Sequence, residues 1–332
     1  MVAAVGSRVV KKILVIGAAG MIGRKLSARL KKDGAGELIL HDVISAGPGA
    51  IVSDLSAPGE AEKLVAARPD LIFHLAAIVS GEAEADFEKG YRINLDGTRR
   101  LFEAVRKEGN GGAGPYRPRL VFTSSIAVFG SPFPPAIGDE FLNAPLTSYG
   151  TQKAIGELLL SDYSRRGFFD GIGIRLPTIC VRPGKPNKAA SGFFSGIIRE
   201  PLSGQEAVLP VPESVRHWFA SPRAAIEFLL HAASLDTARL GSRRNLSMPG
   251  ISATVGEQIE ALRKVGGDTA ARLIRREPDA TIMRIVEGWP QNFDARRALA
   301  LGFRADSSFE EIIRIHVADE LQGTAQPRPG SA

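Results

Sequence analysis

KILVIGAAGMIG, residues 12–23, is the stretch that decides the fold. It begins with a mostly apolar run that indicates a buried strand of a parallel sheet. Glycines then recur at every third position, and residues 24–32 continue with the spacing of a helix. A glycine turn between a strand and a helix lets the backbone approach a pyrophosphate at the helix N-terminus. Such glycines also occur in ordinary turns, but this context favours a nucleotide site at Gly17, Gly20, Met21, Ile22 and Gly23.

The second predicted strand, residues 37–42, ends in an acidic residue. Asp42 lies 42 − 23 = 19 residues after Gly23, near the spacing of about 20 at which a carboxylate binds the adenosine ribose in dinucleotide-binding folds. A carboxylate there repels a 2′-phosphate, so the spacing favours NAD over NADP. The alternative is an aspartate that merely ends a strand, and Arg24 is the one nearby residue that would favour a phosphate.

The composition is that of a globular protein with 332 residues, 44% of them hydrophobic and 23% charged. Cys180 is the single cysteine, which excludes an intramolecular disulfide and favours the reducing cytoplasm. No apolar run reaches the ~20 residues of a membrane helix. The first twelve residues lack the apolar core of a signal peptide. We therefore expect a cytoplasmic protein.

The net charge is +6 and the sequence pI is about 9.5. Lysines and arginines are scattered among acidic residues and accompany no recognition motif, so a mixed solvated surface is favoured over a nucleic-acid site. Part of the positive excess could attract an anionic substrate. The five histidines are far apart and outside any metal-binding motif, and we expect no metal.

Strands and helices alternate along the first half of the chain. We expect strands at 37–42, 50–54, 71–75, 119–123 and 170–176, and helices at 60–67, 87–107 and 148–165. This pattern predicts an α/β fold with a Rossmann-type, doubly wound parallel sheet over residues 10–176. For residues 177–321 we expect mainly a small α/β lid that binds substrate, with some segments that return to the Rossmann core. For residues 322–332 we expect a disordered tail.

Two helices carry predicted apolar faces. Phe87, Tyr91 and Leu95 should begin the face of the helix at 87–107, and the helix at 148–165 should bury Ile155, Leu158, Leu159 and Tyr163. Ser307-x-x-Glu310 is expected to form a capping box at the last helix.

Tyr149 and Lys153 lie four apart on a predicted helix and so share one face. A tyrosine has a pKa near 10, too high for a base at neutral pH, and a neighbouring cation favours its phenolate. This pair occurs by chance in many helices. Ser125 favours a catalytic group over a chance pair, because it ends a predicted strand at the sheet edge where the tyrosine would also project.

The chain resembles the extended short-chain dehydrogenases/reductases of the epimerase/dehydratase group. The resemblance covers about residues 12–223 and rests on GAAGMIG, LHD, SDL, HLAA, NLDGT, TSSIAVFG, YGTQK, IRLPTICVRPG and RHWFASP in that order. It implies Ser125, Tyr149 and Lys153 as the catalytic set, and a homodimer. It also implies further cofactor contacts, with Asp42 at the ribose, Asp54 and Leu55 at the adenine, Leu75, Ala76 and Ala77 along the cofactor, Asn94 supporting the site through water or the lysine, and Pro177 and Thr178 by the nicotinamide.

Two further stretches, from Ala76 to Arg99 and from Arg175 to Pro201, are similar to a subgroup of this family that acts on small sugar acids. That similarity implies NAD-dependent oxidation of the C2 hydroxyl of a four-carbon aldonate. Tyr149 would accept the hydroxyl proton while Ser125 holds the oxygen. The expected substrate contacts are Ser80, Ser125, Ile126, Tyr149, Arg182 and Arg216, with one of the two arginines on the carboxylate.

Two other functions stay open on sequence alone. A nucleotide-sugar epimerase of the same family would use the same hydroxyl groups, and residues 180–216 are basic enough for a diphosphate. A non-catalytic NAD-sensing protein is the second alternative, although such proteins often lose the tyrosine or the lysine that this chain retains.

Overall fold

The computed structural model describes residues 4–5, 8–111, 114–184 and 190–321. Its centre is a seven-stranded sheet in the order β13-β9-β7-β6-β3-β4-β5, and every pairing in it is parallel. The strands are β3 (Lys12–Ile16), β4 (Glu37–Asp42), β5 (Ile51–Val52), β6 (Leu71–His74), β7 (Arg119–Ser125), β9 (Asp170–Leu176) and β13 (Asn245–Ser247). The predicted doubly wound parallel sheet is confirmed.

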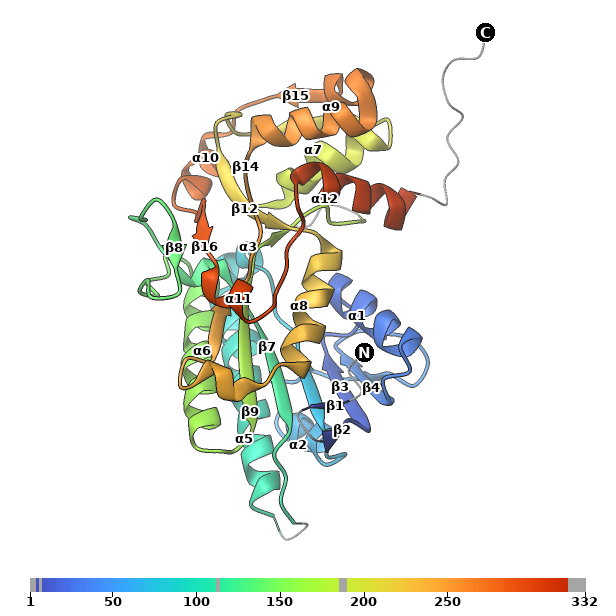
Figure 1. Ribbon diagram of the computed structural model, residues 1–332, viewed down its shortest axis with the longest axis vertical. Coiled ribbons are helices and arrows are strands. Elements are labelled where there is room, and N and C mark those ends of the chain that lie inside the picture. Colours follow the sequence, from blue (N-terminus) through green and yellow to red (C-terminus); the bar gives the residue numbers. More distant parts are fainter. Residues whose placement is uncertain (1–3, 6–7, 112–113, 185–189, 322–332) are drawn as a thin grey trace.

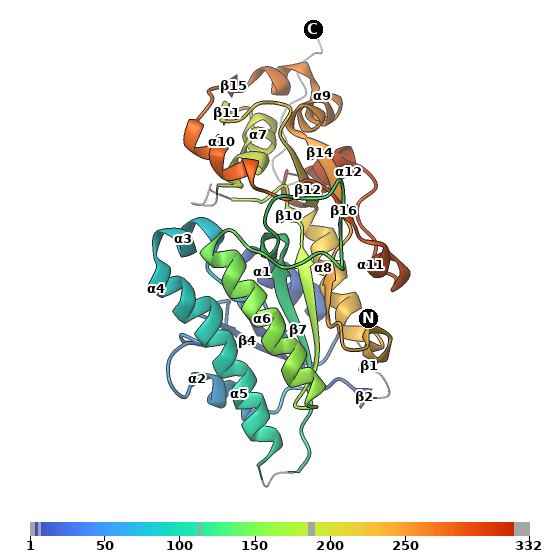
Figure 2. The ribbon, with the colours of Figure 1, turned by 90° about the vertical axis from the view of Figure 1, so that its left-hand side faces the viewer.

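Helices cover both faces of this sheet (Figures 1 and 2). On one face lie α2 (Glu60–Val65), α5 (Gly97–Gly109) and α6 (Ser148–Arg165). On the other lie α1 (Met21–Lys32) and α8 (Pro222–Ser234). Successive side chains of a strand point to opposite faces. Ile13 and Val15 of β3 accordingly join the cluster under α1 and α8, whereas Leu14 and Ile16 join the cluster under α5.

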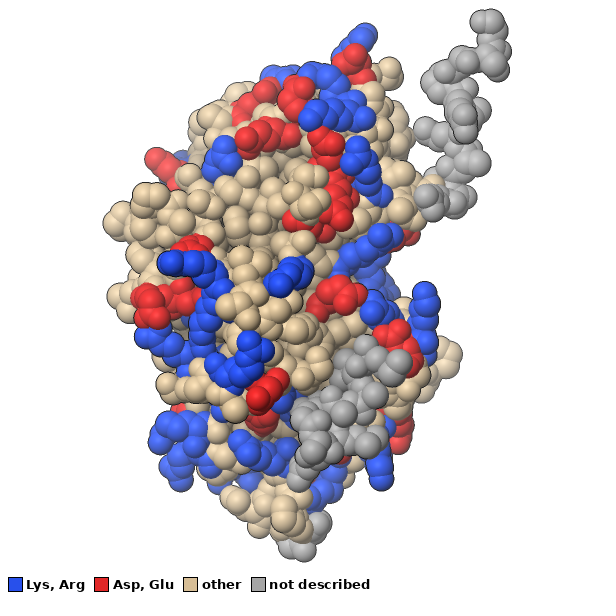
Figure 3. All heavy atoms as spheres, in the orientation of Figure 1, with Lys and Arg blue, Asp and Glu red and all other residues tan. Residues whose placement is uncertain are grey.

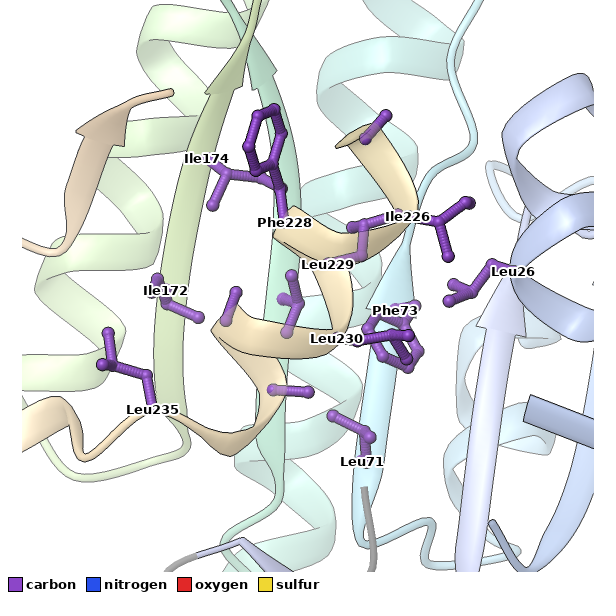
Figure 4. Close-up of a cluster of buried hydrophobic side chains, with 14 of the residues drawn as sticks. Leu26, Leu71, Phe73, Ile172, Ile174, Ile226, Phe228, Leu229, Leu230 and Leu235 are labelled. Atoms are coloured by element: carbon purple, nitrogen blue, oxygen red, sulfur yellow. The ribbon is translucent and has the colours of Figure 1, made fainter. Parts of the chain in front are cut away.

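Figure 4 shows how α8 seals its face of the sheet. Phe228, Leu229 and Leu230 are buried beside Ile172 and Ile174 of β9 and near the aromatic ring of β6, Phe73. Burying a side chain of this size contributes about 1.5–3 kcal/mol. A sheet that is buried on both faces requires nearly continuous apolar strands, which is why the strand segments could be found in the sequence.

A second layer of structure lies beyond one end of the sheet (Figure 1). It contains a sheet in the order β10-β12-β14 and the pair β11-β15. Its elements are β10 (Thr178–Ile179), α7 (Gly192–Leu202), β11 (Ala207–Leu209), β12 (Arg216–Ala220), β14 (Ile251–Thr254), α9 (Val255–Arg272), β15 (Ile274–Arg276), α10 (Ala280–Glu287) and α12 (Phe309–His316). Only Pro177 separates β10 from the carboxyl end of β9, the edge where open α/β sheets bind ligands.

Short elements complete the described chain. They are β1 (Ala4–Val5), β2 (Arg8–Val9), α3 (Ser80–Ala85), α4 (Phe87–Gly90), the π-helical turn η1 (Tyr91–Asp96), η2 (Ile126–Val128), β8 (Ile137–Gly138), η3 (Thr237–Leu240), β16 (Phe293–Asp294), α11 (Arg296–Ala300) and η4 (Val317–Leu321). None of the described helices is long and apolar enough to cross a membrane. Cationic and anionic side chains are intermixed on the face shown in Figure 3. The tail predicted at 322–332 lies outside the described residues.

The predicted helix at 87–107 is wrong in detail. It is three pieces, α4, η1 and α5, and η1 is a π-helical turn between the two α-helices. Asn94 is buried in this turn, while Phe87, which was expected in the apolar face, is 60% exposed.

The predicted apolar face of α6 is only partly right, because Leu159 and Tyr163 pack against the core but Leu158 does not. Leu158 is 69% exposed, and the buried side of the helix also carries Gln152, Lys153 and Glu157. These polar side chains can be buried because residues from other elements bond to them.

The capping box predicted for the last helix at Ser307 and Glu310 is wrong. Ser308 is the N-cap of α12, and its hydroxyl accepts a hydrogen bond from the Glu311 amide at 3.1 Å.

Candidate active site

The glycine turn after β3 forms a cradle with no room for side chains. Gly17 has a φ of 90°, and a Cβ there would lie 2.7 Å from the Ala76 nitrogen. A Cβ at Gly23 would lie 2.0 Å from the Gly17 oxygen. The His41 carbonyl oxygen accepts hydrogen bonds from the amides of Gly17 and Ala18, which ties the turn to β4.

The first turn of α1 completes this cradle. Gly20 is the N-cap, and the amides of Met21 and Ile22 have no acceptor within the helix. Backbone amides at a helix N-terminus favour an anion such as a pyrophosphate. The cradle therefore fits the diphosphate of a dinucleotide.

The carboxylate of Asp42 is fixed beside this turn. Its Oδ2 accepts a hydrogen bond from the Ala19 amide at 2.9 Å, and its Oδ1 accepts one from the Val43 amide at 2.7 Å. Each oxygen keeps a lone pair for a ribose hydroxyl. Arg24 donates to the Ala19 carbonyl oxygen at 2.5 Å, so the loop itself holds this guanidinium. Asp42 and its surroundings therefore fit the diol of the adenosine ribose of NAD.

Asp54 lies in a hydrogen-bonded corner after β5. Ser56 donates to its Oδ1 from both the amide and the hydroxyl, and Arg92 forms an ion pair with its Oδ2. Burial opposes ionisation, but these hydrogen bonds outweigh it and hold the pKa of Asp54 below its usual value. The adjacent Leu55 is buried in the core.

The segment after β6 runs past the glycine turn. Leu75 donates its amide to the Ile16 carbonyl oxygen, and the next residue, Ala76, lies against Gly17. Ala76 and Ala77 are small and half-buried. Asn94 fastens the end of this segment, because its Oδ1 accepts from the Ile78 amide at 2.9 Å.

Asn94 also reaches α6. Its Nδ2 donates to the Gln152 Oε1 at 2.8 Å. Sequence reasoning expected Asn94 to act through water or Lys153, but its direct partners are Ile78 and Gln152. It therefore joins the strand-end segment to the helix that carries the tyrosine.

Ser125, Tyr149 and Lys153 meet at the start of α6. Ser125 ends β7, and its hydroxyl lies near enough to the Tyr149 phenol to lower the pKa of that phenol. Lys153 Nζ lies 5.8 Å from the centre of the Tyr149 ring and donates to the Thr123 carbonyl oxygen at 2.8 Å. Gly150 makes this approach possible, since a Cβ there would lie 2.2 Å from the oxygen of Ala127, two residues after Ser125.

Burial and charge act on these groups in opposite directions. Burial raises the pKa of Tyr149, whereas the hydrogen bond with Ser125 and the charge of Arg182 lower it. Arg182 is thus a cation that favours the phenolate, a role that sequence reasoning gave to Lys153. Burial lowers the pKa of Lys153 to about 8, against the charge of Glu157.

Residues after Pro177 border this group. Arg182 is held by the Ile179 carbonyl oxygen and the Ser191 hydroxyl, at 3.1 Å and 3.0 Å. Thr178 shares a 2.7 Å hydrogen bond with His217 Nε2. Burial lowers the pKa of His217 to about 4, so this ring is neutral at physiological pH.

Arg216, Ser80 and Ile126 lie in different surroundings. Arg216 donates to the Ser252 carbonyl oxygen at 3.2 Å and pairs with Glu257 at 3.3 Å. It lines a pocket of about 540 Å³ with side chains from 131–137 and 287–292. Ser80 is the first residue of α3, and Ile126 is buried in an apolar cluster.

Sequence reasoning missed three polar residues that the structure ties to this site. They are Gln152, Glu157 and Arg175, all buried. Glu157 carried a signal, since it follows Tyr149 and Lys153 at the same spacing of four residues. The sequence pattern gave no signal for Arg175, whose role depends on how β9 pairs with β7.

Known proteins are similar to this chain over most of its length. Residues 13–227 match the model of the NAD dependent epimerase/dehydratase family. A D-erythronate dehydrogenase from Cupriavidus necator is 46% identical, over 92% of this chain and 98% of that protein. One from Haemophilus influenzae is 42% identical, over 91% and 98%.

Solved structures show the same fold. A structure described as a nucleoside-diphosphate-sugar epimerase from Agrobacterium tumefaciens is 65% identical, covers 98% of this chain and 99% of that chain, and has a TM-score of 0.90. An L-threonine dehydrogenase from Clostridium difficile has a TM-score of 0.84 at 21% identity, over 94% of this chain and 98% of that chain, and so supports the fold alone.

Proposed function

The chain belongs to the NAD-dependent epimerase/dehydratase family, and we propose that it oxidises the C2 hydroxyl of D-erythronate to give 2-dehydro-D-erythronate, with NAD as cofactor. Support for the substrate comes from the two D-erythronate dehydrogenases, which match nearly the whole chain. The observation that carries the chemistry is the contact between Ser125 and Tyr149, one helical turn from Lys153.

The proposed roles follow from the positions of these side chains. Ser125 would hold the substrate oxygen and Tyr149 would accept its proton, because the two hydroxyl groups lie close together at the end of β7 and the start of α6. Lys153 would stabilise the phenolate and bind a ribose hydroxyl. Bound NAD supplies the hydride acceptor. The protein's own contribution is to position these groups and to favour the charges that develop on them.

We propose Arg182 as the carboxylate anchor of the substrate, because its charge already acts on Tyr149. Ser80 and Ile126 stay as proposed substrate contacts, and the lid formed mainly by residues 177–321 would enclose the sugar acid. Arg216 is the weaker candidate, since Ser252 and Glu257 engage it. Arg182→Met should raise KM for the aldonate at least tenfold, whereas Arg216→Met should change it little.

The decisive experiment is NADH formation, followed at 340 nm, with a panel of four- to six-carbon aldonates. D-erythronate should give the highest kcat/KM. Tyr149→Phe should lower kcat by about 10²-fold or more while NAD binding, measured by calorimetry, stays near wild type. A variant that kept a tenth of the wild-type rate would refute the assignment of Tyr149 as the base.

A nucleotide-sugar epimerase is the second candidate, favoured by the description of the 65% identical structure. Such an enzyme would interconvert nucleotide sugars without net NADH. Incubation with nucleotide sugars and catalytic NAD separates the two functions. Redox-neutral isomerisation, with no NADH from any aldonate, would establish the epimerase.

We also propose a homodimer in the cytoplasm. Phe87 of α4 and Leu158 of α6 are large apolar side chains exposed on neighbouring helices, and covering them would stabilise an interface. The single buried cysteine, Cys180, suits a reducing compartment. Light scattering should give twice the chain mass for the wild type and less for Leu158→Asp. A wild-type monomer would refute the dimer.

A further inference from the structure

The buried carboxylate of Glu157 joins α6 to three other segments. Its Oε1 accepts hydrogen bonds from Ser124 Oγ at 2.5 Å and from Arg175 Nε at 2.9 Å. Its Oε2 accepts from Arg175 Nη2 at 2.7 Å and from Asn143 Nδ2 at 3.0 Å. These partners come from β7, β9 and the loop before α6. A carboxylate bonded on both oxygens in the interior is held in one position.

The position of Glu157 brings its charge to Lys153. The two residues lie four apart on α6 and so share a helical face. Ser124, which donates to Glu157, immediately precedes Ser125. The carboxylate therefore contacts the strand end that holds one member of the proposed catalytic set, and it lies one turn from another.

The Lys153 ammonium is surrounded by neutral groups from two strands and by side chains of its own helix. β7 supplies the Thr123 carbonyl oxygen and the Phe122 ring, whose centre lies 4.9 Å from the Lys153 Nζ. α6 supplies Tyr149, whose pKa burial raises, and Glu157, whose charge raises the pKa of Lys153. β6 supplies His74, which is neutral because burial lowers its pKa to about 3. Glu157 is the one anion among these groups.

We propose that Glu157 is a positioning residue, whose fixed carboxylate holds a negative charge one helical turn from Lys153 and so favours the ammonium beside Tyr149. The inference rests on the proposed function, because it requires Lys153 to serve Tyr149 in turnover. It goes beyond that function by assigning a task to a residue that touches neither substrate nor cofactor. Arg175 opposes the same task, since its cation pairs with the carboxylate that Lys153 needs.

The test is the pH dependence of kcat/KM for aldonate oxidation. In Glu157→Gln the alkaline limb, where the rate falls as Lys153 loses its proton, should move toward lower pH by about one unit. The rate on that limb should then be about tenfold below wild type at equal pH. Arg175→Gln removes the opposing cation, so its limb should move toward higher pH.

Two further variants separate charge from structure. Asn143→Ala removes one hydrogen bond from the same carboxylate without changing its charge, so its limb should stay at the wild-type position. Glu157→Gln leaves Arg175 unpaired and can fold poorly. The double variant Glu157→Gln/Arg175→Gln leaves neither charge buried alone. The alkaline limb of its kcat/KM profile should lie at lower pH than the limb of the wild type.

The opposite directions of the two single variants are decisive. If both lowered kcat with limbs at the wild-type position, or with limbs moved in the same direction, Glu157 would be structural and the inference would be overturned. Lys153→Met distinguishes failure of the proposed function. If that variant kept more than a tenth of the wild-type rate, the role of Lys153 itself would fall. If it lost activity while Glu157→Gln kept a wild-type limb, only the inference would fall.

Discussion

Replacing Lys153 by methionine should remove activity and yet stabilise the fold at neutral pH. Burial lowers the pKa of this ammonium from 10.5 to about 8. A difference of roughly 2.5 units corresponds to about 3 kcal/mol that the folded state loses by keeping Lys153 charged. The lost hydrogen bond to the Thr123 carbonyl oxygen offsets about 1 kcal/mol. A net gain of about 2 kcal/mol is therefore expected for Lys153→Met.

The sign of this effect depends on pH in a definite window. The pKa of Lys153 is lower in the folded state than in the unfolded state, so between pH 8 and about 10.5 the unfolded chain binds more protons. Wild-type stability should consequently rise through that window relative to the variant. The advantage of Lys153→Met should be greatest below pH 8 and should shrink as pH approaches 10.5.

Urea unfolding followed by far-UV circular dichroism, at pH 7, 8, 9 and 10, measures this difference. The control is Lys63→Met, because Lys63 is a largely exposed lysine paired with Glu60. Its stability should stay within about 1 kcal/mol of the wild-type value, as is typical for an exposed ion pair. If Lys153→Met differed from wild type by a constant amount across the range, the buried ammonium would not be the source, and the reasoning would be refuted.

Two predictions concern the cofactor. Asp42→Ser should raise KM for NAD at least tenfold. It should also reduce the preference for NAD over NADP, because it removes the charge that repels a 2′-phosphate. If the ratio of kcat/KM for the two cofactors did not change, Asp42 would not bind the ribose. Gly23→Ala places a Cβ 2.0 Å from the Gly17 oxygen, so the turn must open; calorimetry should show NAD affinity at least tenfold weaker, whereas Gly34→Ala, where a Cβ meets nothing within 4 Å, should leave it near wild type.

The sheet and its helices were predictable where local signals agree. The strands at 37–42 and 170–176 and the helix at 148–165 begin and end as expected. Each strand is a short apolar run, and the helix follows Thr147, whose hydroxyl caps the Gly150 amide. Ser221 caps α8 in the same way, because its hydroxyl accepts a hydrogen bond from the Ala224 amide and Pro222 takes the first position of the helix. These are features of a few neighbouring residues, so a sequence displays them directly.

The contacts of the site were less predictable, because they join distant parts of the chain. Asn94 lies in η1, a π-helical turn that no residue pattern between Phe87 and Lys107 predicts, and its partners are Ile78 and Gln152, far away in the chain. The partners of Glu157 come from positions 124, 143 and 175 and meet only after β7 and β9 pair. The motif named Ser125, Tyr149 and Lys153, whereas the groups that set their charges had to be read from the fold.

The helix that carries the site is also one whose buried face was only partly assigned, and the two facts have one cause. Hydrophobic spacing finds the whole inward face of a helix only when apolar side chains fill it. On α6 that face includes apolar residues but also buries Gln152, Lys153 and Glu157, while Leu158 is turned outward. Burying such polar groups costs stability unless every partner is present, and proteins keep that cost where function requires the charge. A well-capped helix whose inward face mixes apolar and charged side chains is therefore itself a sign of where the chemistry lies.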